Sequence, residues 1–315
     1  MLNGQNAWVE GARLSQQRKR EEKMGPYREF LSAEDAAQAA SLEWYHSIQL
    51  APGLVTPGRL SAEALARQLR TVRLPDNLQG KTVLDIGAYD GFYSFAAEER
   101  GAARLVALDH YVWSTDTPAY MAEWRRTLRD GHLMPAKHES RYWHPDTLPG
   151  KRPFDLAHAA RNSRVTAVVG DFMAMDLAPL GQFDVVLFLG VLYHLTDPLG
   201  ALRRVARVTA PDGLAIIETE AMEAVGLHDR AYCEFFPGEE LNHDASNWWA
   251  PNATALDGLC HAAGFQEVTI LTPRATPGRR ARLRAALRVL RGQPAGPPIR
   301  YRLIAHARRG TSRTI

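Results

Sequence analysis

Residues 81–93, KTVLDIGAYDGFY, constrain the fold of this chain more than any other segment. A short apolar run carries Asp85 and is followed at once by Gly87 and Gly91, before a helix-like segment begins at Tyr93. A buried strand that leads through a glycine turn into a helix N-terminus brings backbone N–H groups close to a ligand. We expect Gly87 to adopt a backbone conformation that a Cβ would oppose, and Gly91 to let the chain approach a ligand closely. Because Asp85 can accept hydrogen bonds from an amine, the pattern favours a nucleoside cofactor carrying an amino acid over a dinucleotide.

Three further apolar runs end in residues suited to the same ligand. Residues 105–109, LVALD, end in an acid 18 residues after the last glycine of the turn, close to the separation at which an acid holds ribose hydroxyls. Residues 165–170 are followed by Asp171 and Phe172, and residues 183–190 are apolar almost throughout, as a strand buried on both faces should be. Four such runs with helical spacers predict an α/β fold. Before them, residues 32–49 predict a helix with Ser32 as N-cap and Trp44 along one side, and after them we expect a helix over residues 198–208, a strand over 214–218 and a helix over 253–263.

The Asp-x-Gly-x-x-x-Gly spacing is similar to the first motif of class I S-adenosylmethionine (SAM) methyltransferases, although a third glycine often stands where this chain has Tyr89. The resemblance implies SAM as cofactor and S-adenosylhomocysteine (SAH) as product. It implies that Asp109 holds the ribose, that Asp171 reaches the adenine amino group and that Phe172 packs on the ring. The implied cofactor-binding residues are Asp85, Gly87, Tyr89, Gly91, Asp109, His110, Asp171, Phe172 and Gly190.

The same resemblance implies a Rossmann-like sheet, mostly parallel with an antiparallel last strand, and helices on both faces. We expect an N-terminal helical extension or lid over residues 1–59, the methyltransferase domain over residues 60–309 and a tail over residues 310–315. Two aromatic-rich insertions, residues 110–152 and 221–252, exceed the minimal fold. Long ordered loops in compact domains are usually lids or binding elements. We therefore expect the insertions to form the acceptor pocket, with plain surface excursions as the alternative.

Composition agrees with this interpretation. The 315 residues are 45% hydrophobic, enough for a full core, and a net charge of +3 gives little sign of a polyanionic partner. Cys233 and Cys260 have no metal-ligand spacing and indicate a reducing compartment. No segment reaches the roughly 18 apolar residues of a membrane span, and the N-terminus lacks a hydrophobic signal region. We expect a soluble cytoplasmic protein that does not bind membranes.

A closer resemblance rests on WYHSI at residues 44–48, GVLYH at residues 190–194 and IIET at residues 216–219. Together they look like the branch of SAM methyltransferases that includes the tRNA wobble-uridine carboxymethyltransferases. The resemblance implies that Tyr193 helps to hold the carboxylate of a carboxylated SAM. That branch completes the grip with a lysine- and tryptophan-rich segment, whereas residues 44–58 contain no lysine. Since desolvating a carboxylate without a cation is costly, we expect ordinary SAM and methyl transfer.

Methyl transfer from a sulfonium requires an acceptor that is aligned with the methyl–sulfur bond and freed of its proton. His194, just past the fourth apolar run, is the first candidate for a base or orienting residue, and His46 is the second. Tyr193 completes this predicted catalytic group. Any of the 11 histidines can equally be an ordinary surface or core residue. The histidines lack His-x-x-x-His spacing and we expect no metal, although a magnesium-dependent O-methyltransferase that uses acids of the second insertion stays open.

The second insertion indicates the acceptor, because its acids lie close in sequence to several aromatic residues. This mixture suits an amine-bearing small molecule through ion pairs and cation–π contacts, and a solvated acidic rim over a tryptophan core is an equal alternative. The predicted substrate-binding residues are Glu234, Glu239, Glu240, Asp244 and Trp248. We expect an N-methyltransferase that acts on an amino sugar or aminoglycoside-type natural product, as in antibiotic biosynthesis.

Two other function classes stay open. Residues 279–291 contain six arginines, which can hold RNA phosphates in a wobble-uridine-type tRNA modification enzyme. The more ordinary interpretation is that Leu283, Leu287 and Leu290 dock this helix while the arginines face water. The third class is a catalytically silent SAM-binding protein, against which the intact acids of the cofactor motifs argue.

Overall fold

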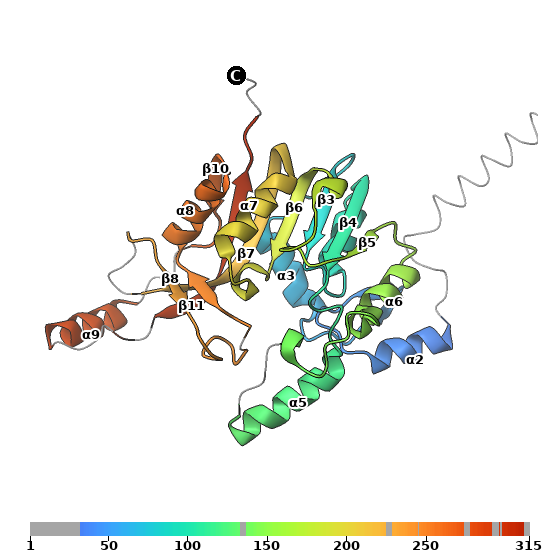
Figure 1. The fold of residues 1–315 in the computed structure, drawn as a ribbon, viewed down its shortest axis with the longest axis horizontal. Helices are drawn as coiled ribbons and strands as arrows, with labels where there is room; N and C mark the ends of the chain where they lie inside the picture. The colour runs from blue at the N-terminus through green and yellow to red at the C-terminus, as the bar shows by residue number, and fades with distance from the viewer. Residues whose placement is uncertain are drawn as a thin grey trace, which may run out of the picture.

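The structure is a computed structural model that describes residues 32–132, 137–224, 229–244, 246–273, 278–291, 296 and 298–311. Residues 1–31 and 312–315, which include much of the expected N-terminal extension and tail, lie outside this part. A seven-stranded sheet forms the centre, and helices cover both of its faces (Figure 1). The strands of this sheet are β3 Thr82–Ile86, β4 Arg104–Asp109, β5 Thr166–Val169, β6 Phe183–Leu189, β7 Thr209–Glu223, β10 Glu267–Ile270 and β11 Ile299–Arg308.

The strand order is β10-β11-β7-β6-β3-β4-β5. Strands β3 to β7 are mutually parallel, and β11 lies antiparallel between β7 and β10. The predicted mostly parallel sheet with an antiparallel last strand is therefore confirmed. The strand expected over residues 214–218 is longer, because the far half of β7 continues to pair with β11 as far as Glu223.

Alternating side chains of the strands divide the core in two. Val83 packs in one core with residues of α4 and α6, whereas Leu84 and Ile86 face a second core with α7 and α8. The described helices are α2 Ala33–Ser41, α3 Ala62–Val72, α4 Phe92–Glu99, α5 Thr117–Asp130, α6 Arg152–Ala160, α7 Pro198–Val208, α8 Ala253–Ala263 and α9 Arg279–Leu290. In the described ranges no helix combines the length and the apolar character that crossing a membrane requires.

The N-terminal helix is shorter than predicted. Ser32 caps it as expected, since its side chain accepts a hydrogen bond from the Asp35 N–H, but the helix ends at Ser41 rather than near residue 49. Trp44 is buried in the core instead of lying on a helix face. The chain then forms a small hairpin of β1 Gln49–Ala51 and β2 Leu54–Val55.

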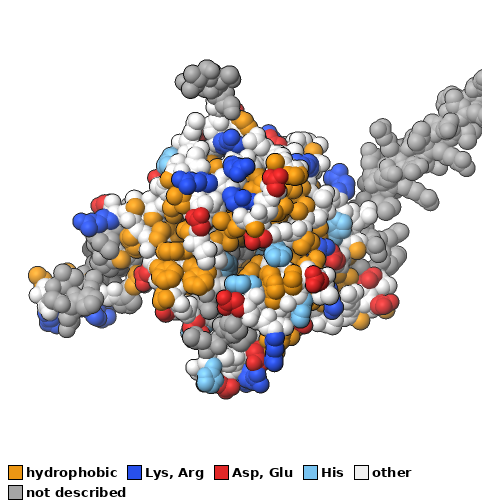
Figure 2. Space-filling view, in the orientation of Figure 1, with side chains coloured by type: hydrophobic (Ala, Val, Ile, Leu, Met, Phe, Trp, Pro, Cys, Tyr) orange, Lys and Arg blue, Asp and Glu red, His pale blue; other side chains and the backbone are white. Residues whose placement is uncertain are grey.

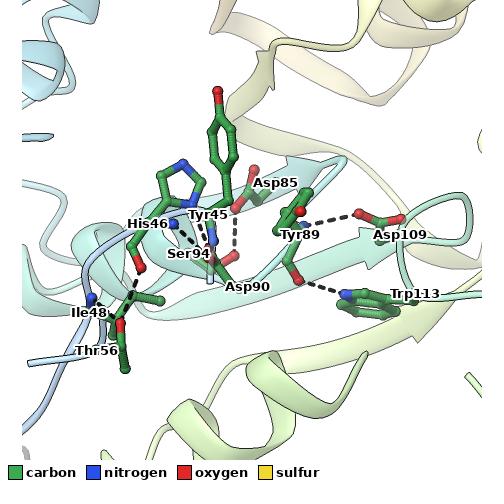
Figure 3. Close-up of polar contacts among 10 residues, drawn as sticks. All are labelled: Tyr45, His46, Ile48, Thr56, Asp85, Tyr89, Asp90, Ser94, Asp109 and Trp113. Carbon is green, nitrogen blue, oxygen red and sulfur yellow. Dashed lines mark hydrogen bonds and ion pairs between the residues drawn. The ribbon is translucent and has the colours of Figure 1, made fainter. Parts of the chain in front are cut away.

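The segment between α2 and α3 is fixed to the β3–α4 turn by the fully buried Asp90. The backbone N–H groups of Tyr45 and His46 donate to Asp90 Oδ2 at 3.1 and 2.8 Å, and His46 Nδ1 lies 2.5 Å from Oδ1 (Figure 3). The His46 ring also stacks on Phe92, with 5.1 Å between the ring centres. One carboxylate thus joins the N-terminal segment to the turn that precedes α4.

The expectation that the leucines of α9 dock this helix is wrong. Leu283, Leu287 and Leu290 are 63%, 45% and 83% exposed, while the smaller Ala285 is buried. Figure 1 shows α9 at the side of the molecule, away from the central sheet. The helix therefore presents its leucines together with arginines at the surface.

We predict that Gly87 is required by packing as well as by backbone conformation. Gly87 and Gly53 have φ of +78° and +79°, but a Cβ on Gly87 would lie 2.5 Å from Val191 Cγ2, whereas one on Gly53 meets nothing within 4 Å. Both alanine variants should lose about 1–2 kcal/mol for the left-handed backbone, and Gly87→Ala about 1–3 kcal/mol more for overpacking. Urea denaturation measures both losses, and equal losses would contradict the packing argument.

We also predict that Asp90→Ala strongly destabilises the fold. The substitution leaves two backbone donors and the buried His46 without their acceptor, a change that typically costs about 3–5 kcal/mol. Asp76→Ala is the matched control, since Asp76 is exposed and surface substitutions usually stay within about 0.5 kcal/mol. Chemical denaturation of both variants tests this, and a loss for Asp90→Ala no larger than that of the control would show that the carboxylate does not hold the segment.

Candidate functional site

The turn after β3 contains three residues in the left-handed region, with φ of +78° at Gly87, +53° at Tyr89 and +88° at Gly91. The Tyr89 N–H donates to Asp109 Oδ2 at 3.0 Å, and its carbonyl accepts from Trp113 Nε1 at 2.7 Å (Figure 3). A non-glycine residue holds such a conformation only where its surroundings over-determine it. The bonds to Asp109 and Trp113 account for Tyr89.

The side chain of Tyr89 turns toward the N-terminal segment, where its ring centre lies 5.3 Å from that of Tyr45.

The structure also gives a reason for Gly91 other than the expected approach to a ligand. A Cβ on Gly91 would lie 2.7 Å from the Phe95 ring and 2.8 Å from Phe154. Side-chain packing behind the turn, together with the positive φ, therefore requires this glycine.

Two buried carboxylates lie at the ends of neighbouring parallel strands, Asp85 in β3 and Asp109 in β4. Burial raises the pKa of Asp85 to about 6, against the opposing effect of a 2.6 Å hydrogen bond from Ser94 Oγ. Burial also raises the pKa of Asp109, although it accepts N–H bonds from Tyr89 and Val112. Figure 3 shows Asp85 between the N-terminal segment and the part of the turn that faces Asp109. Desolvated carboxylates attract cations and hydrogen-bond donors to this edge of the sheet.

The other predicted cofactor residues follow β4, β5 and β6 at the same edge. Asp171 is exposed and accepts a 2.8 Å hydrogen bond from the Met173 N–H. Phe172 is buried beside Phe188, with 5.8 Å between their ring centres. Gly190 is left-handed after β6 and donates its N–H to the Glu218 carbonyl at 2.9 Å. The half-buried His110 meets Trp143 edge to face at 5.2 Å.

Arg302 of β11 is a site residue that the sequence analysis missed. Its guanidinium binds both carboxylate oxygens of Glu218 and one of Glu220, the latter at 2.7 Å, and lies 5.1 Å from the Tyr193 ring centre. The expectation that no cation lies near Tyr193 is therefore wrong. One positive charge nevertheless faces two negative ones, a net charge of −1. The sequence shows Glu218 and Glu220 in one apolar strand and Arg302 in another, and this was the only sign of the cluster. Only the register between β7 and β11 brings these charged residues together.

The two insertions contact each other and the loop after β6. Trp124 Nε1 in α5 donates to the His243 carbonyl at 2.8 Å, and Lys137 Nζ lies 3.7 Å from Asp244 Oδ2. In the second insertion, β8 Cys233–Phe235 pairs with β9 Trp249–Pro251. Just before β9, the Trp248 N–H donates to the Tyr193 carbonyl at 2.7 Å. These contacts lie beside the predicted catalytic residues.

His194 lies within a second polar cluster. Its Nδ1 is 3.0 Å from the Ser246 carbonyl oxygen and 3.1 Å from Ser246 Oγ, which in turn donates to Asp244 Oδ1 at 2.6 Å. Burial lowers the pKa of His194 to about 4. Burial opposes the charge of Asp244, but Lys137, His194 and the two hydrogen bonds from Ser246 together hold the pKa of this carboxyl at about 2. His194 is therefore neutral and Asp244 ionised at neutral pH.

The predicted substrate-binding residues separate into two groups. Asp244 and Trp248 lie at His194 and Tyr193, as described above, and the Trp248 ring stacks on Phe235 with planes 9° apart. Glu234 and Glu240 are exposed, with Glu240 accepting the Gly238 N–H, and Glu239 is half-buried. Hydrophobic side chains gather across the middle of the face in Figure 2, with histidine and acidic side chains among them. Among the residues that the structure describes, no three His, Cys, Asp or Glu side chains are grouped as metal ligands.

Comparison with known proteins identifies the family of this chain. A family model described as a methyltransferase domain matches residues 59–270. The tRNA U34 carboxymethyltransferase of Campylobacter lari is 23% identical over 200 residues, which cover 63% of this chain and 54% of that protein. The enzyme of the same name from Desulfotalea psychrophila is 25% identical over 199 residues, covering 62% and 48%. The chain thus spans about half the length of the curated relatives it matches.

The fold also has a counterpart among solved structures. The N-terminal domain of EvdMO1 with SAH bound has a TM-score of 0.50 and 16% identity, over 88% of this chain and 94% of that one. At this identity the likeness concerns the fold. Since the family model covers well over half of the chain and the sheet is mostly parallel with the predicted antiparallel last strand, the chain belongs to the class I SAM-dependent methyltransferases.

Proposed function

We propose that this protein transfers the methyl group of SAM to the amine of a small-molecule acceptor of the amino-sugar or aminoglycoside type. The observation that carries the proposal is the excess of negative charge at the carboxyl edge of the sheet. Asp85 and Asp109 are buried carboxylates, and the Arg302 cluster adds a net charge of −1. Such a site favours a cationic cofactor and an amine-bearing acceptor.

The residues at the strand ends fit SAM. Asp85 would receive the α-ammonium group, which relieves the cost of its burial. Each oxygen of Asp109 accepts a hydrogen bond from a backbone N–H, and the remaining lone pairs would accept hydrogen bonds from the ribose hydroxyls. Asp171 and the edge of Phe172 would meet the adenine after β5. When bound, SAM supplies a methyl group already activated by a sulfonium.

The Arg302 cluster argues for methyl rather than carboxymethyl transfer. Glu218 and Glu220 already neutralise the guanidinium, so a carboxylated cofactor would add a third carboxylate beside Tyr193. Two like charges 4 Å apart cost about 4 kcal/mol at an effective dielectric constant of 20. A repulsion of this size acts only on the carboxylated cofactor and therefore favours binding of SAM.

We assign His194 to the acceptor amine and His46 to structure. His46 is almost fully buried and bound to Asp90, so its position holds the turn. A His194 imidazole with a pKa of about 4 is too weak a base to activate a hydroxyl at neutral pH. It can accept a hydrogen bond from an amine N–H and so orient the nitrogen lone pair. The low basicity favours N-methylation over O-methylation.

A tRNA modification enzyme is the second candidate. The curated relatives carry the name tRNA U34 carboxymethyltransferase. The exposed side chains of Arg280 and Arg284 on α9 add a basic surface that suits phosphates. The same helix also exposes three leucines, which phosphate binding does not use.

The Asp85 assignment predicts pH-dependent binding of SAH. Its carboxylate attracts the α-ammonium only when ionised, and because its pKa is raised to about 6, that attraction is present above pH 6 and is lost as the pH falls through 6. Calorimetric affinity for SAH should fall by up to about tenfold per pH unit below pH 6. Adenosine lacks the α-amino group of SAH and serves as the control. In Asp85→Asn, the affinity for SAH should depend much less on pH over the same range. Equal slopes for SAH and adenosine would remove Asp85 from this role.

The acceptor class and the cofactor are tested together with methyl-labelled SAM. Label should pass to amino sugars of a panel and not to bulk tRNA, and carboxylated SAM should be the poorer cofactor. Glu220→Gln, which removes one negative charge from the Arg302 cluster, should increase the relative use of carboxylated SAM, whereas Glu267→Gln, exposed on β10, should not. Label in tRNA alone, or a wild-type preference for the carboxylated cofactor, would establish the second candidate.

A further inference from the structure

The hydrogen bonds around His194 select one tautomer. Its Nδ1 lies 3.0 Å from the carbonyl oxygen of Ser246. A carbonyl oxygen accepts hydrogen bonds and cannot donate them, so Nδ1 must carry the hydrogen. A neutral imidazole with hydrogen on Nδ1 has its lone pair on Nε2. The backbone of the second insertion thus determines which ring nitrogen is free to accept a hydrogen bond.

Asp244 reinforces the same choice through Ser246. The Ser246 hydroxyl donates its only hydrogen to Asp244 Oδ1 at 2.6 Å, so its oxygen acts as a second acceptor for the His194 Nδ1–H, 3.1 Å away. Asp244 Oδ1 also accepts the Ser246 backbone N–H at 2.9 Å. An ionised carboxylate has no hydrogen to donate. While Asp244 is charged, a hydroxyl that rotated to donate to the imidazole would give up its hydrogen bond to an ionised carboxylate.

Lys137 of the first insertion keeps Asp244 charged. Its ammonium is 3.7 Å from Asp244 Oδ2 and lies over the rings of Tyr111 and Tyr120, 5.2 and 5.4 Å from their centres. An ammonium beside a half-buried carboxylate favours the ionised form. The chain of contacts from Lys137 through Asp244 and Ser246 to His194 therefore connects both insertions with the loop after β6.

We propose that Ser246 and Asp244 are positioning residues that hold His194 as the Nδ1–H tautomer, leaving Nε2 to accept the hydrogen bond of the substrate amine. This inference rests on the proposed function. The charged groups that act on His194 are Asp244, Lys137 and Arg302, and the rings of Tyr193 and Tyr111 pack near it. A reversed tautomer would present an N–H to the amine lone pair and compete with its attack on the methyl group.

The geometry predicts an order of effects that a purely structural role would not. Asp244→Asn introduces an amide N–H that can donate to Ser246 Oγ, which frees the hydroxyl to donate to Nδ1 in competition with the carbonyl acceptor and so raises the population of the other tautomer. Ser246→Ala removes the hydroxyl but keeps the carbonyl acceptor. We expect kcat to fall about 100-fold in Asp244→Asn, within the range of proton-handling groups, and less than about 10-fold in Ser246→Ala, with KM for SAM unchanged in both. Asp146→Asn, exposed in the first insertion, is the control.

Nitrogen NMR of the full chain carrying ¹⁵N-histidine reads the tautomer directly, and His194→Gln identifies the signal. The wild type and Ser246→Ala should show the Nδ1–H form, and Asp244→Asn a shift toward Nε2–H. An Nε2–H signal in the wild type, or a tautomer that switches without loss of turnover, would overturn the inference. The NMR result does not depend on the acceptor, so a protein that methylates no amine would refute the proposed function while the tautomer assignment is judged separately.

Discussion

The turn between β3 and α4 is the constraint on which the rest of the site depends. Three of the five residues from 87 to 91 have a left-handed backbone conformation, and the chain turns there at the end of the buried strand β3. That conformation persists because Asp109 and Trp113 bind the backbone of Tyr89, while Asp90 holds the N-terminal segment against the same turn. The acids of the site are therefore structural partners before any ligand is present. Backbone N–H donors hold the carboxylates of Asp90 and Asp109 in place, and the Ser94 hydroxyl holds that of Asp85.

Negative charge is the second organising feature. Asp85 and Asp109 are desolvated by the core that surrounds the strand ends, and Glu218 and Glu220 outnumber the arginine they bind. Burying carboxylates at this edge lowers the stability of the folded state, because the charged groups lose their hydration. Binding a cation recovers part of that cost. Under the proposed function, the choice of cofactor and the choice of acceptor both follow from the negative charge of this sheet edge.

The insertions give this common sheet its particular site. They meet through Trp124 with His243 and through Lys137 with Asp244. The same stretch of the second insertion reaches His194 and Tyr193 after β6. Under the proposed function, the residues that position His194 thus come from the insertions, whereas those suited to the cofactor come from the strand ends. Such a division allows acceptor specificity to change while cofactor binding is kept.

Sequence patterns alone determined the strands that carry the acids and the bounds of α7 and α8, which the structure reproduces, while the antiparallel final strand was implied by the family resemblance. These features are local, because periodicity, caps and glycine turns act within a few residues. Tertiary structure decided the pairing of Arg302 with Glu218, 84 residues apart, and of His194 with Ser246, 52 residues apart. It also decided that the α9 leucines face outward, because a helical stripe indicates an apolar face without showing whether anything covers it. Contacts between distant segments depend on strand register and loop paths, and neither property is encoded in a local pattern.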